Sequence, residues 1–165
     1  MGQGASMKTA HRQSSQAKRV MRQAWSSDNN PVARALRSAK AADEFRTQVL
    51  TVRIKLYQFE HGADATDLLA CLAVVIGTPC EAGARQFGHT PWVSQLHGAL
   101  RTIQTMCLDG YCWQEQYAHA LNRAIEIAVE LRNFDVDIFT SAWQDANGLA
   151  VQIMNHAVSA DAVAA

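Results

Sequence analysis

The stretch FRTQVLTVRIKLYQFE, residues 45–60, decides between an all-helical fold and one that contains a sheet. Residues 50–57 alternate between apolar and other side chains, as a half-buried strand would. Against this, the alanine-rich lead-in over residues 33–42 favours a helix, because alanine has the highest helix propensity. Helical steps of four and three also connect five apolar residues of the stretch: Phe45, Val49, Val52, Leu56 and Phe59. We therefore predict a helix over residues 31–60.

A second apolar stripe runs along the same predicted helix. It consists of Leu50, Ile54 and Tyr57, which also follow helical steps of four and three. One apolar stripe requires one covering surface, and two stripes require two. We therefore predict that this helix packs against neighbours on two sides.

Prolines and glycines predict where the other helices begin and end. Four glycines follow apolar periodic segments and are expected to end helices in the left-handed conformation: Gly62, Gly77, Gly88 and Gly110. Each proline follows a residue that caps helices well, which predicts a helix start at three places: Asn30-Pro31, Thr78-Pro79 and Thr90-Pro91. Thr78 and Glu81 also have the spacing of a capping box.

These boundaries predict an all-α fold, a compact bundle of about five helices. The expected segments cover residues 31–60, 64–77, a short turn at 79–87, 91–109, 113–133 and a last helix capped by Asp135. Five residues of the last helix are expected to face inward: Ile138, Ala142, Trp143, Leu149 and Ile153. We place the bundle at residues 30–158, after a basic N-terminal segment (1–29, helical over 9–25) and before an alanine-rich tail (159–165).

The formal net charge is zero, but the charges are unevenly distributed along the chain. Eight basic residues and one acidic residue precede position 41, whereas four basic and eleven acidic residues follow position 60. Such an asymmetry indicates a basic arm that binds an anionic partner. That partner could also be the acidic half of the same chain or of a second copy. The residues expected to contact a partner or phosphates are Lys8, Arg12, Lys18, Arg19, Arg22, Trp25, Arg34, Arg37 and Lys40.

Partner binding is the leading functional hypothesis. A helical body offers interaction surfaces, and Trp92 and Trp113 are residue types that often anchor interfaces, although each could equally belong to the core. We expect a non-enzymatic, regulatory interaction protein whose partner is another protein or a second copy, in a homo-oligomer. The alternative is a nucleic-acid-associated protein that contacts phosphates through the arm. A helix-turn-helix over residues 67–87 is conceivable, but its second helix would carry Arg85 as its single base.

Catalysis is expected to be absent, because no phosphate-binding loop or nucleophile elbow occurs. A small metal-dependent helical enzyme is the second alternative. Glu115 and His119 are four residues apart, and Cys107 and Cys112 could meet His97 or His119 in a zinc site. The spacings do not match known metal motifs, so we expect no metal and no cofactor.

A cytoplasmic location is expected, because the start of the sequence lacks the apolar region of a secretory signal. The four cysteines form no C-x-x-C pair and are expected to be reduced thiols. The loose match of residues 1–6 to a myristoylation pattern, and the resemblance of the acid-free start to a transit peptide, are weaker alternatives. The longest apolar run, residues 68–76, is half of what a membrane-spanning helix requires, so no span is expected.

Overall fold

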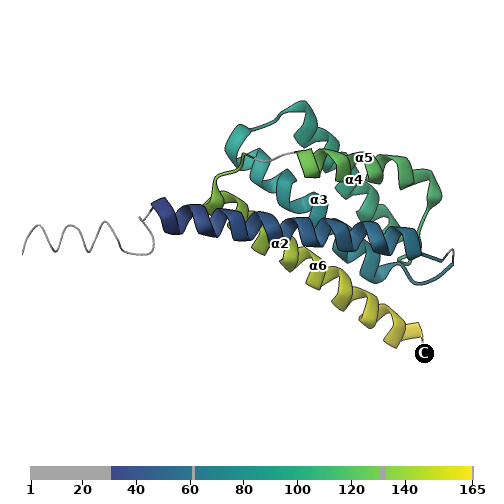
Figure 1. Cartoon of the computed structure of the whole chain (residues 1–165). Helices are drawn as coiled ribbons and strands as arrows, with labels where there is room; N and C mark the ends of the chain where they lie inside the picture. Colours follow the sequence, from purple (N-terminus) through teal and green to yellow (C-terminus); the bar gives the residue numbers. More distant parts are fainter. Residues whose placement is uncertain (1–30, 61, 131–132, 165) are drawn as a thin grey trace, which may run out of the picture. The chain divides into compact units, whose positions relative to one another are not determined.

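The computed structural model describes residues 31–60, 62–130 and 133–164, and in these ranges it consists of helices joined by short connections, with no strand (Figure 1). The predicted all-α fold is therefore confirmed. The chain divides into two units, residues 1–40 and 41–165. The helices are α2 (Pro31–Gln58), α3 (Thr66–Phe87), α4 (Pro91–Leu108), the 3-10 turn η1 (Glu115–Tyr117), α5 (Ala118–Glu130) and α6 (Val136–Ala164).

The core of the second unit is built around α3, which α4, α5 and α6 contact (Figure 1). Residues 45–52 of α2 contribute their predicted apolar face to this core, where Phe45, Val49 and Val52 are buried. The largest side chains that are almost completely buried come from α3, α4 and α5: Leu69, Leu72, Ile76, Leu96, Ile103, Met106, Leu121 and Ile125.

The helix α3 continues through the sequence Gly77-Thr78-Pro79, where a break was predicted. Gly77 does not end a helix, Pro79 does not begin one, and the expected capping box is absent because the Thr78 hydroxyl donates to the Val74 carbonyl (2.8 Å). The helix-turn-helix considered for residues 67–87 is excluded for the same reason, since no turn separates two helices there.

Burial explains why α3 tolerates an internal proline. Proline inside a helix costs about 3 kcal/mol, because it removes one hydrogen bond and crowds the preceding turn. Fifteen residues of α3 are buried, and each large apolar side chain contributes about 1.5–3 kcal/mol when removed from water. Gly77 also faces α6 closely, since a Cβ atom added there would lie 3.4 Å from the Cβ of Ala146. Tertiary packing therefore outweighs the local break.

The continuous α3 also changes the basis of the membrane prediction. With 22 residues, α3 is long and apolar enough to span a membrane by length and composition alone. The length of the apolar run at residues 68–76 is therefore not a valid reason to exclude a span. However, 78% of its most apolar window is buried inside the bundle, as in the central helix of many globular domains. One such helix is weak evidence and does not establish a span.

Other predicted boundaries agree with the structure. The Thr90 side chain accepts a hydrogen bond from the Val93 N–H at the start of α4, with Pro91 in the first turn. The Asp135 carboxylate accepts from the Asp137 N–H (2.9 Å) and caps α6. The three remaining glycines have positive φ angles, between 73° and 86°: Gly62, Gly88 and Gly110. Gly110 follows the end of α4 as predicted, but Gly88 at the end of α3 has a ψ of −153°, outside the left-handed helical region, and Gly62 lies four residues after the end of α2.

The helix predicted over residues 113–133 is shorter than expected. Trp113 lies before the first helical residue of this segment. The 3-10 turn η1 covers Glu115–Tyr117, and α5 begins only at Ala118. The Trp113 indole N–H donates to Glu115 (3.0 Å), and its ring packs against Phe59. The aromatic packing of this segment replaces the first helical turn.

Candidate functional site

The predicted cationic contact residues fall into two groups. Arg34, Arg37 and Lys40 lie on the first turns of α2 at successive steps of three, and all three are exposed. Arg34 and Lys40 also have interaction partners within the chain. The other predicted contact residues lie outside the described residues: Lys8, Arg12, Lys18, Arg19, Arg22 and Trp25.

The second apolar stripe of α2 is exposed. Leu50 is 59% exposed, Ile54 47% and Tyr57 92%, so the prediction that α2 packs on two sides is wrong within one copy of the described chain. At about 100° per residue, Ile54 lies about 160° around the helix from the buried Val52. The bundle therefore covers one apolar face of α2 and leaves the opposite face in solvent.

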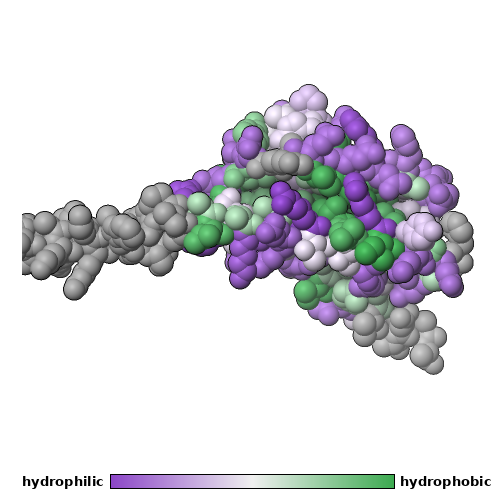
Figure 2. All heavy atoms as spheres, in the orientation of Figure 1, coloured by the Kyte–Doolittle hydropathy of each residue, from purple (hydrophilic) through white to green (hydrophobic). Residues whose placement is uncertain are grey.

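Exposed apolar side chains continue on α6. Trp143 packs against Phe45 of α2, and Met154 lies three turns later on the same side of α6. Met154 and its neighbour Val151 are exposed. Figure 2 shows apolar surface over the C-terminal half of α2 and again over α6 in a single view. We call this set the α2–α6 apolar surface: Leu50, Ile54, Tyr57, Val151 and Met154.

One inward prediction for α6 is wrong. Leu149 is 41% exposed, whereas Ala142 is fully buried and Ile138, Trp143 and Ile153 are half-buried. The side of α6 that carries Ser141 and Asp145 faces the end of α3, and this orientation leaves Leu149 at the edge of the contact.

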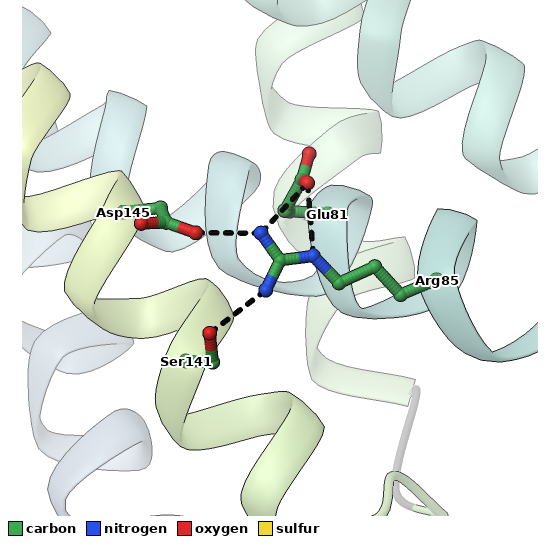
Figure 3. A network of polar contacts seen from close by, with 4 residues as sticks. All are labelled: Glu81, Arg85, Ser141 and Asp145. Atoms are coloured by element: carbon green, nitrogen blue, oxygen red, sulfur yellow. Dashed lines mark hydrogen bonds and ion pairs between the residues drawn. The ribbon is translucent and has the colours of Figure 1, made fainter.

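Arg85 connects α3 to α6 through a polar network (Figure 3). Its guanidinium contacts Glu81 (3.0 Å) one turn earlier, and it reaches Asp145 (2.5 Å) and the Ser141 hydroxyl (2.9 Å) on α6. Asp145 and Glu81 raise the pKa of Arg85. The Glu81–Arg85 spacing of four could have indicated one of these pairs, but nothing in the sequence indicates that Asp145 and Ser141 join it.

Many acidic groups of the bundle are engaged locally. Asp67 pairs with Lys55 of α2, and Glu126 pairs with Arg123 within α5 (3.0 Å). Asp64 accepts from the backbone N–H (3.0 Å) and the hydroxyl (2.6 Å) of Thr66 at the start of α3. The acidic character of the second half of the sequence is therefore used in part for caps and pairs inside the bundle.

The candidate metal ligands do not come together. In the described ranges, no group of three or more histidine, cysteine, aspartate or glutamate side chains is arranged to hold a metal ion. Cys107 and Cys112 therefore form no such site with His97 or His119. Glu115, considered together with His119, instead accepts the Trp113 indole hydrogen bond.

Three of the four cysteine thiols, one buried and two half-buried, have raised pKa values. Burial, with a smaller contribution from Glu81, raises the pKa of Cys80 to about 12. Burial also raises the pKa of Cys71 and of Cys107. Because the thiolate is the reactive form, these raised pKa values disfavour nucleophilic attack by the three groups near neutral pH.

The two tryptophans proposed as interface anchors contribute to packing instead. Trp92 contacts Phe87 and Phe134 with ring centroids 6.2 and 6.3 Å apart, and Trp113 packs against Phe59. The structure therefore offers two exposed features, the basic first turns of α2 and the α2–α6 apolar surface. Comparison of the chain with protein-family models, with curated proteins and with solved structures finds no match.

Proposed function

We propose that this chain is a non-enzymatic helical interaction protein that binds another macromolecule through its bundle surface and its cationic N-terminal segment. The bundle would provide an apolar contact area, and the basic residues would provide electrostatic attraction. In this view its role is regulatory or scaffolding, and it needs no cofactor.

The exposed second face of α2 is the observation that carries this proposal. Leu50 and Ile54 are large apolar residues at positions where a helix with one buried face usually carries polar side chains. Tyr57 is a residue type enriched at interface hot spots and is almost fully exposed. Contiguous apolar patches on soluble domains commonly mark interaction sites, so a partner is the simplest physical reason for this face.

Site-specific cross-linking of the full chain tests the proposal. A photoreactive benzoylphenylalanine at position 57 is expected to give a discrete adduct in cells that make the protein, because Tyr57 lies on the α2–α6 apolar surface. The matched control carries the same residue in place of Gln104, an exposed polar position of α4. Mass spectrometry of the adduct identifies the partner. Absence of an adduct at position 57, or identical adducts at both positions, would contradict the proposal.

Nucleic-acid binding is the second candidate, favoured by the exposed bases on the first turns of α2. Arg34, Arg37 and Lys40 lie within two helical turns and follow five further basic residues in the sequence. Such a cluster can neutralise several phosphates without reading the base sequence. The salt dependence of binding, treated in the Discussion, separates this candidate from the first.

A further inference from the structure

We draw no further inference here: the strongest candidate, the exposed apolar stripe of α2 formed by Leu50, Ile54 and Tyr57, carries nothing beyond the proposed function, because nothing in the part of the chain that the structure describes shows what covers it.

Discussion

At the scale of single residues, Gly83 shows how one missing side chain positions a helix. It lies inside α3, where glycine is less favourable than alanine. A Cβ atom at this position would lie 2.0 Å from the ring of Trp92, far closer than atoms can approach. Glycine therefore allows the ring of Trp92 in α4 to approach α3 closely and to reach Phe87 and Phe134.

We predict that Gly83→Ala lowers the stability of the fold. The added methyl group must displace the Trp92 ring, and overpacking of this kind costs roughly 1–3 kcal/mol. Gly98→Ala is the matched control on α4, where no atom lies within 4 Å of the added Cβ, and it is expected to stabilise by roughly 0.5–1 kcal/mol. Thermal unfolding of both variants provides the measurement, and equal shifts in Tm would show that the close contact has no energetic effect.

At the scale of elements, the network around Arg85 determines how α6 lies on α3. Gly77 permits a close approach near Ala146, and Arg85 binds Ser141 and Asp145 on an adjoining side of α6. Together these contacts fix the rotation of α6 about its axis. That rotation decides which residues of α6 are exposed, Val151 and Met154 among them.

We predict that Asp145→Ala lowers Tm by roughly 1–3 °C at low salt, because partly exposed ion pairs contribute little individually. The matched control is Glu126→Ala, which removes an exposed pair within α5 and connects no two helices. The difference between the variants is expected to shrink as salt rises, since salt screens the Arg85–Asp145 attraction. A difference independent of salt would assign the effect to packing of α6.

At the scale of the whole molecule, the distribution of charge separates the two functional candidates. Bases are concentrated before residue 41, whereas several acids of the bundle already serve as caps and ion pairs. Local engagement of these acids leaves fewer of them to neutralise the basic segment. An anionic partner would therefore be attracted to the basic segment, whereas the bundle, in which acidic residues outnumber basic ones, would repel it.

Binding to duplex DNA across a salt series is the matching prediction. If the segment binds phosphates, replacing Arg34, Arg37 and Lys40 together by glutamine is expected to reduce the slope of log K against log salt by up to about 2.7. The control replaces Arg101 and Arg123, two exposed bases on α4 and α5, and is expected to leave the slope unchanged. Fluorescence anisotropy of labelled DNA measures both. Absence of binding by the wild-type full chain at low salt would reject the nucleic-acid candidate.

Much of the fold could be predicted from local sequence signals. The steps of four and three over residues 45–59 identified the buried face of α2, and Thr90 and Asp135 identified the starts of two helices. These signals are readable because periodicity and capping depend on residues within one or two turns. The same is true of the positions of charged residues along the chain.

Burial required the tertiary structure, because it depends on segments distant in the sequence. The motif Gly77-Thr78-Pro79 breaks an isolated helix, and only the packing of α3 among α4, α5 and α6 shows that it remains helical. The two stripes of α2 look equally apolar in the sequence, yet one is covered by the core and the other, with Leu50 and Ile54, is exposed. The sequence by itself determined that the fold is all-helical, where α4 and α6 begin, and where the charges lie along the chain. Only the tertiary structure decided which apolar face remains exposed, since local propensity carries no information about which distant segments will cover it.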